Sequence, residues 1–115
     1  ENFGLSLKEA TIGDRLKSAG YATGWFGKSH LGYKPAFHPL KRGFDEYFGF
    51  LGGMHDYLDA AADKNNPILK GTEPVDNIGY TTEACYWCLS DIGLFCIALF
   101  RIKRLKAYLT VNLLV

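Results

Sequence analysis

The spacing of apolar and polar residues predicts one helix near the start of the chain. Apolar side chains recur at helical spacing within residues 5–20, and charged residues occupy the other faces. Residues 6–9, Ser-Leu-Lys-Glu, match a capping box in which Ser6 and Glu9 would begin the helix. Gly20 stands where a residue in the left-handed conformation would end it.

Residues 21–26 are short, largely apolar and aromatic, and they predict a buried strand. A helix that leads directly into a buried strand is half of a βαβ unit, so we expect an α/β fold with a mostly parallel sheet. In such sheets functional residues gather just past the carboxyl ends of the strands. Residues 27–30, Gly-Lys-Ser-His, lie at that position.

The remaining pattern predicts less regular structure. Residues 32–57 combine glycines, prolines and aromatic residues, which indicates a long ordered loop held by aromatic packing. Residues 58–80 are polar and indicate a surface excursion, with turns at Asn65-Asn66-Pro67 and Lys70-Gly71. Residues 84–100 carry a single charge, Asp91, and precede a basic run. Taken alone they resemble a short membrane span with a positive flank, in which Asp91 would be costly.

Length and composition limit the chain to one small domain. It has 115 residues, of which 48% are hydrophobic and 22% charged, so we expect a chain that folds rather than wholesale disorder. The net charge is +1, yet residues 101–115 hold four basic residues and no acid. A basic run can mark contact with nucleic acid or an anionic membrane. Because a solvated helix end explains four charges equally well, we expect no nucleic-acid partner.

The three cysteines, Cys85, Cys88 and Cys96, all lie in the last third of the chain. Their odd number argues against a self-contained disulfide framework. Cys85 and Cys88 form a single C-x-x-C motif, without the thioredoxin-like context of a redox site or the two further ligands of a zinc site. We therefore expect buried thiols.

Lys28 and His30 are the candidate catalytic and substrate-binding residues. If the chain stays extended, their side chains point to the same side. Lysine supplies a fixed positive charge and histidine a donor or proton shuttle, a pair that can grip a sulfate or phosphate ester. A solvated lysine beside a surface histidine is the alternative that these four residues, taken alone, favour.

Other candidate sites are weaker. Residues 22–29 loosely fit a phosphate-binding loop, but Trp25 and Phe26 would crowd a loop that needs small residues. We therefore reject that reading. Structural or solvated positions account for the remaining polar candidates, which are His38, His55, Lys41, Arg42, and the adjacent carboxylates Asp45 and Glu46.

Residues 20–32, Gly-Tyr-Ala-Thr-Gly-Trp-Phe-Gly-Lys-Ser-His-Leu-Gly, resemble the second signature of the sulfatase family, G-Y-x-T-x-x-x-G-K-x-H followed by Leu-Gly. Residues 38–50 are similar to the family's Pro-x-x-x-Gly-Phe-Asp-x-Phe-x-Gly stretch. Weaker similarity extends through residues 2–5, 73–75 and 79–83. The resemblance identifies residues 1–83 as a partial sulfatase catalytic domain.

The resemblance implies a fragment of an alkaline-phosphatase-like α/β/α sandwich that hydrolyses sulfate esters. In that family a Cys or Ser in a C/S-x-P-x-R motif becomes formylglycine, and a calcium ion stabilises the sulfate oxygens. Lys28 would contact the sulfate and the formylglycine, and His30 would hydrogen-bond the formylglycine hydroxyls. The expected substrate is a small-molecule sulfate ester or a sulfated glycan.

The chain departs from the family pattern at three points. Ser29 stands where the family often has Trp, which removes a packing group but not the two functional side chains. Neither a C/S-x-P-x-R motif nor the paired Asp and Asn metal ligands occur. We therefore expect no metal ligands here and no activity of the isolated chain. Residues 84–115 show neither the amphipathic helix nor the Lys-Pro-Phe-Phe-like strand of the family, so we interpret them as a divergent or frameshifted apolar tail with a basic segment.

Two other functions stay open at the level of sequence. A phosphate or phosphonate ester hydrolase of the same superfamily would share the fold and differ at the missing nucleophile motif. A small membrane-associated interaction protein would use residues 84–106 as its anchor. The chain begins at Glu1 without the basic and apolar segments of an export signal. Sulfatases are often periplasmic, extracellular or lysosomal, so the compartment stays open.

Overall fold

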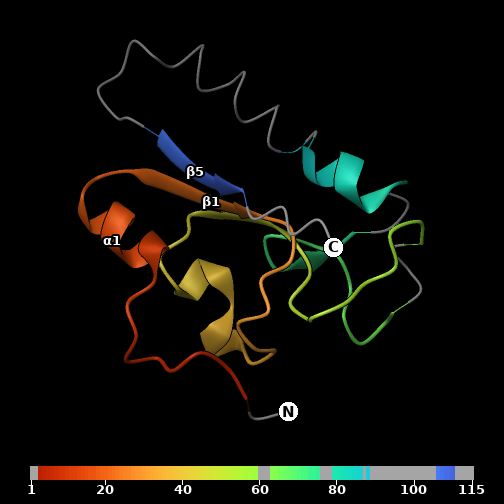
Figure 1. Cartoon of the computed structure of the whole chain (residues 1–115), viewed down its shortest axis with the longest axis horizontal. Coiled ribbons are helices and arrows are strands. Elements are labelled where there is room, and N and C mark those ends of the chain that lie inside the picture. The colour runs from red at the N-terminus through yellow and green to blue at the C-terminus, as the bar shows by residue number, and fades with distance from the viewer. Residues whose placement is uncertain (1–2, 60–62, 76–78, 87, 89–105, 111–115) are drawn as a thin grey trace.

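The computed structural model describes residues 3–59, 63–75, 79–86, 88 and 106–110 (Figure 1). Its elements are, in chain order, α1 (Ile12–Ser18), β1 (Ala22–Phe26), the 3₁₀ helices η1 (Pro35–Phe37) and η2 (Pro39–Lys41), β2 (Glu46–Gly49), β3 (Leu69–Lys70), β4 (Glu73–Pro74) and β5 (Lys106–Thr110). Residues 81–86 and 88 are also helical.

The strands form one sheet in the order β4-β3-β2-β1-β5. β1 pairs in parallel with both β2 and β5, and Figure 1 shows β5 alongside β1. The β2–β3 and β3–β4 pairs are antiparallel. The centre of the sheet is therefore parallel and one edge is antiparallel, which confirms the predicted α/β class.

Both faces of the sheet are covered. Phe26 and Phe48 pack on one face with Cys85 from the helical residues 81–86. Their neighbours Trp25 and Tyr47 pack on the opposite face, because successive side chains of a strand alternate. In Figure 1 the 3₁₀ helices and α1 lie below the sheet and residues 81–86 lie above it. This is the layering that a parallel sheet requires.

The predicted helix start is wrong. α1 begins at Ile12, and its capping box is formed by Thr11 and Asp14 rather than by Ser6 and Glu9. The Thr11 hydroxyl accepts a hydrogen bond from the Asp14 amide at 3.1 Å, and the Asp14 carboxylate accepts one from the Thr11 amide at 2.8 Å. Both segments match the capping pattern, so the pattern alone did not distinguish them.

Arg42 supplies the reason why residues 5–9 are not helical. Its guanidinium is buried and donates to the carbonyl oxygens of Leu5 at 3.0 Å, Ser6 at 3.1 Å and Glu9 at 2.8 Å. In an α-helix these carbonyls would accept from amides four residues ahead. Arg42 takes their place as donor, and thereby holds the N-terminal segment against the 3₁₀ helices.

The other end of the helix and the first strand agree with the prediction. Gly20 has φ +87°, the left-handed conformation expected after a helix, and it follows the C-cap Ala19. β1 covers five of the six residues predicted for the strand, and residues 23–26 are buried.

The predicted long loop and the surface excursion both contain strands. β2 lies within residues 32–57, and β3 and β4 lie within residues 58–80. Gly49 lets β2 approach the backbone of Gly27 closely, because a Cβ at position 49 would collide with the Gly27 carbonyl. Ile68 is completely buried, so the excursion contributes to the core. Gly71 does form the predicted turn, with φ +64°.

Residues 106–110 of the tail form a strand of the sheet. β5 pairs with the whole of β1, with Ala22 opposite Lys106 and Phe26 opposite Thr110. Residues 89–100 of the candidate membrane span lie outside the described residues. Within the described ranges, no helix has both the length and the apolar character needed to cross a membrane. The division of the chain into residues 1–83 and 84–115 remains a prediction.

Asp45 fastens β2 to β1. Its carboxylate accepts hydrogen bonds from the Thr23 amide at 3.0 Å and the Thr23 hydroxyl at 3.2 Å, and forms an ion pair with Lys17 at 2.7 Å. Partial burial alone would raise the pKa of Asp45, but the bonds from Lys17 and Thr23 outweigh it, so this pKa lies below its ordinary value of 3.8. Asp45 is therefore a structural carboxylate rather than a catalytic one.

We predict that Asp45 contributes stability that acid removes. Because its folded pKa is depressed, the contribution is fully present above the unfolded pKa and is lost as pH falls through the folded pKa. Asp45→Asn should lower the unfolding free energy near neutral pH by about 1 kcal/mol, since the pair is partly exposed. Urea titrations between pH 3 and pH 7 should show a smaller loss on acidification in the variant. Glu46→Gln, an exposed neighbour, serves as the control, and equal acid sensitivity of Asp45→Asn and wild type would contradict the assignment.

Candidate active site

Lys28 lies directly past the carboxyl end of β1, as predicted. The hydrogen bonding between β1 and β2 continues beyond both strands, because the Gly27 amide donates to the Phe48 carbonyl at 2.7 Å and the Ser29 amide to the Phe50 carbonyl at 3.0 Å. The Trp25 indole donates to the Lys28 carbonyl at 3.1 Å. The backbone of the lysine is thus held on both sides, while its side chain is only half-buried.

His30 leaves the extended conformation. Its φ is +49°, which makes it the one non-glycine residue with positive φ among the described residues. Lys28 and His30 would point to the same side only if the chain were extended, and at His30 it is not. The following residue is anchored, since the Leu31 carbonyl accepts from the Leu5 amide at 2.9 Å. His30 itself is exposed.

The His30 ring lies against the backbone of Gly53. A Cβ added to Gly53 would stand 3.0 Å from both Cε1 and Nε2 of the ring. This contact joins the signature segment to the loop that follows β2. The sequence does not predict this contact, because Gly52-Gly53 indicates only a turn and nothing local relates the pair to His30.

Ser29, which lies between Lys28 and His30 in the sequence, is buried in the interior. It is 7% exposed, and its hydroxyl lies near that of Tyr47, which is 3% exposed. Neither hydroxyl makes a hydrogen bond of normal geometry within the described residues. Burial raises the pKa of the Tyr47 phenol well above its ordinary value, and the Ser29 hydroxyl offsets part of that rise. Ser29 therefore belongs to the buried interior rather than to the solvent-exposed part of the segment.

The other histidines have structural contacts. His38 is buried, accepts a hydrogen bond from the Leu40 amide at 3.2 Å on Nδ1, and packs edge-on against Tyr47 with ring centres 4.9 Å apart. Burial lowers the pKa of His38, so its neutral form is favoured. His55 lies 2.8 Å from the Asp56 carbonyl through Nδ1 and packs on Phe50, with ring centres 5.2 Å apart.

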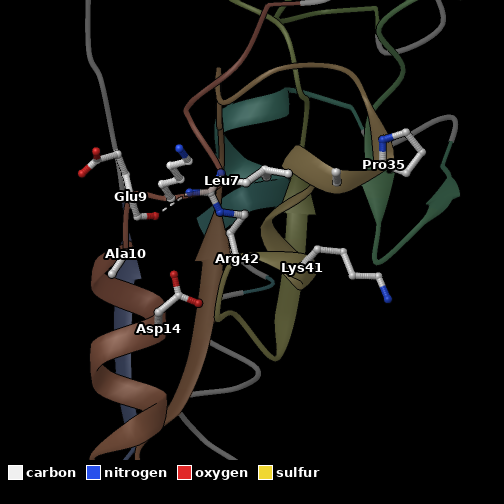
Figure 2. A pocket seen from close by; sticks show the side chains of 9 residues that line it. Leu7, Glu9, Ala10, Asp14, Pro35, Lys41 and Arg42 are labelled. Carbon is white, nitrogen blue, oxygen red and sulfur yellow. Dashed lines mark hydrogen bonds between the residues drawn. The ribbon is translucent and has the colours of Figure 1, made fainter.

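A surface pocket of about 640 Å³ lies away from Lys28 and His30. Figure 2 shows its lining, with Asp14 on α1 and Lys41 and Arg42 near the 3₁₀ helices. Arg42 already donates to backbone carbonyls there, one of them that of Glu9 in Figure 2. Neither Lys28 nor His30 lines this pocket. The pocket is therefore not the predicted catalytic site.

The residues present do not fit the metal or the nucleophile that the sulfatase resemblance implies. Within the part of the chain that the structure describes, no three His, Cys, Asp or Glu side chains gather closely enough to hold a metal ion. The sequence contains no C/S-x-P-x-R motif in which a formylglycine could form. Lys28 and His30 are therefore the candidate site residues that this chain offers.

Cys85 is a core residue rather than a redox centre. It packs with Phe26, Phe48 and Ile68, and burial, together with the nearby Cys88, raises the pKa of its thiol to about 11. Neither Cys85 nor the half-buried Cys88 is in a disulfide. This agrees with the predicted buried thiol at Cys85, while Cys96 lies outside the described residues.

The match to a family model decides the identity of the chain. The model described as Sulfatase matches residues 2–90. The chain belongs to the sulfatase family. Members of this family act on sulfate esters or sulfated glycans and generally depend on a metal and a formylglycine.

Individual sulfatases support the assignment. The chain is 43% identical over 72 residues to N-acetylgalactosamine-6-sulfatase of Sus scrofa, a match that covers 63% of this chain and 14% of the relative. It is 52% identical over 90 residues to arylsulfatase G of Rattus norvegicus, which covers 78% of this chain and 14% of the relative. The chain thus spans about a seventh of the length of these curated sulfatases.

Solved structures agree on the fold. The crystal structure of Ps i-CgsB superimposes with a TM-score of 0.76 and 31% identity over 98% of this chain and 28% of that protein. Its complex with k-i-k-neocarrahexaose gives a TM-score of 0.74 and 31% identity over 96% of this chain and 27% of that protein. These superpositions extend over almost the entire chain, whereas the family match ends at residue 90.

We predict that Cys85 resists alkylation in the folded chain. A raised thiol pKa leaves little thiolate at neutral pH, and burial blocks access. Iodoacetamide at pH 7.5, followed by peptide mass spectrometry, should label Cys85 slowly in buffer and rapidly in urea. Cys85 labelling at equal rates in both conditions would contradict a core position.

Proposed function

We propose that the complete protein containing this chain hydrolyses sulfate esters, and that Lys28 and His30 form part of its catalytic site. The observation that carries the proposal is the position of the family's Gly-Lys-x-His segment, directly past a buried parallel strand. This is where parallel sheets collect functional residues. Both side chains retain access to solvent, so both can reach a ligand.

Lys28 supplies the positive charge. The sulfate group of an ester carries negative charge on its oxygens, and that charge is redistributed as the sulfur is attacked. An ammonium group on a flexible stem can follow these oxygens, provided that its backbone is fixed. The Trp25 indole and the Gly27 and Ser29 amides provide that fixed backbone. Lys28 would therefore lower the barrier by binding the oxygens and orienting the sulfate.

His30 supplies a hydrogen-bond donor or a proton. Imidazole changes protonation near neutral pH and can serve in either role. By its resemblance to the sulfatase signature, His30 would hydrogen-bond the hydroxyls of the formylglycine nucleophile. The contact with Gly53 covers one part of the ring around Cε1 and Nε2, which limits the directions from which a partner can approach.

The nucleophile and the metal are expected outside this chain. When bound, the metal would stabilise negative charge on the sulfate oxygens, and we propose calcium held by Asp and Asn ligands of other segments. Because the residues present do not fit these groups, we assign to this chain only anion contact and hydrogen bonding. This division is consistent with a chain that spans a small part of its relatives.

The relatives suggest a carbohydrate sulfate as the first substrate to test. One relative is named N-acetylgalactosamine-6-sulfatase, and one structural neighbour was solved with k-i-k-neocarrahexaose. We propose a sulfated glycan or a small-molecule sulfate ester as the substrate. The sulfatase family match does not favour a phosphate or phosphonate ester hydrolase, or a membrane-associated interaction protein.

We predict that Lys28→Ala and His30→Ala each lower kcat/KM of the complete protein for an aryl sulfate by about 10²–10⁴-fold, the range typical of positioned catalytic groups. Lys64→Ala removes an exposed lysine far along the chain and should leave the rate unchanged. Circular dichroism should confirm that all three variants are folded. Wild-type rates in both site variants would contradict the proposed roles.

We also predict that the isolated 115-residue chain does not hydrolyse aryl sulfates. Members of a catalytic unit act together, and those present do not compensate for a missing nucleophile. The assay compares the chain with the complete protein at equal molar concentration. Hydrolysis by the purified chain that disappears in Lys28→Ala would overturn this expectation.

A further inference from the structure

The left-handed backbone of His30 needs support from its surroundings. A non-glycine residue with φ +49° is uncommon and costs conformational energy, so it persists only where neighbouring contacts hold it. The backbone bonds of Ser29 and Leu31 fix the residues on either side of His30. They do not fix the imidazole, which lies against the backbone of Gly53.

Gly53 is itself held from the opposite direction by Asn66. This side chain is 4% exposed, and its amide bridges the two residues that flank the glycine. Oδ1 accepts from the Gly52 amide at 2.8 Å, and Nδ2 donates to the Met54 carbonyl at 2.8 Å. A side-chain amide that satisfies one donor and one acceptor two residues apart fixes the backbone between them, as a strand neighbour would.

The packing around this bridge is close. A Cβ on Gly52 would lie 2.6 Å from Asn66 Nδ2, and one on Gly53 would lie 3.0 Å from the His30 ring. The sequence Gly52-Gly53 thus lets the loop lie between a buried amide and an exposed imidazole without displacing either. The loop backbone therefore contacts Asn66 on one side and His30 on the other.

We propose that Asn66 is a positioning residue for His30 and acts through Gly53. The inference rests on the proposed role of His30. The Asn66 side chain bonds to the Gly52 amide and the Met54 carbonyl, so it would act on His30 indirectly. Its buried amide sets where the Gly53 backbone stands, and that backbone sets the orientation in which the imidazole can donate its hydrogen bond.

The positioning is tested directly by nuclear magnetic resonance of the 115-residue chain with labelled histidines. His30→Gln assigns the His30 signal. Asn66→Ala removes the bridge, and Gly53→Ala places a methyl group against the ring while keeping both Asn66 hydrogen bonds. Both should shift the His30 Cε1–Hε1 resonance and leave that of His38 in place. Asn65→Ala, a neighbouring exposed asparagine, should leave the His30 resonance unchanged.

If Asn66→Ala does not fold, Gly53→Ala still tests the contact between Gly53 and His30 through which Asn66 would act. An unshifted His30 resonance in folded Gly53→Ala would overturn the proposal. So would a shift of equal size in Asn65→Ala, since that would show general sensitivity of the loop rather than a specific bridge.

Kinetics of the complete protein separate this inference from the proposed function. Asn66→Ala should lower kcat by up to about 100-fold with little change in KM, because misplacing a catalytic group by about an ångström has that effect. On a His30→Ala background the same change should have almost no further effect. A full additional loss there would assign Asn66 a merely structural role. Wild-type activity of His30→Ala would instead refute the proposed function.

Discussion

The parallel hydrogen bonding between β1 and β2 continues past the end of both strands, and the placement of the signature segment depends on it. The Gly27 and Ser29 amides bond to Phe48 and Phe50, so the chain that carries Lys28 advances in register with the chain after β2. This register also delivers Gly53 to His30. The core residues of both strands stabilise the pairing from both faces of the sheet. Residues 27–30 are therefore held by the pairing of β1 and β2, although they do not themselves form a helix or a strand.

Local signals predicted the parts of the fold that local interactions determine. The buried strand, the left-handed Gly20 and the position of Lys28 follow from residues adjacent in the chain. The helix start did not, because Ser6 and Thr11 both match a capping box and the choice depends on Arg42, more than thirty residues away. β2 was missed for a similar reason. Its aromatic residues suit either a packed loop or a strand, and only pairing with β1 distinguishes the two.

The candidate site shows the same limit. Lys28 and His30 were visible as a motif, whereas the contact of His30 with Gly53 and the bridge from Asn66 were not. Glycines and an Asn-Asn-Pro sequence indicate turns, and nothing in their spacing relates them to an imidazole twenty or more residues earlier. Supporting residues of this kind act through backbone geometry, and that geometry becomes apparent only in three dimensions.

We propose that Lys28 and His30 are two members of a centre completed by other segments of a sulfatase. The most direct test is a crystal structure of the complete protein with inorganic sulfate bound. It should place the Lys28 ammonium on a sulfate oxygen, with the His30 ring still against Gly53 and directed toward the nucleophile. A sulfate bound in a catalytic centre with both side chains beyond hydrogen-bonding distance of its occupants would contradict the account.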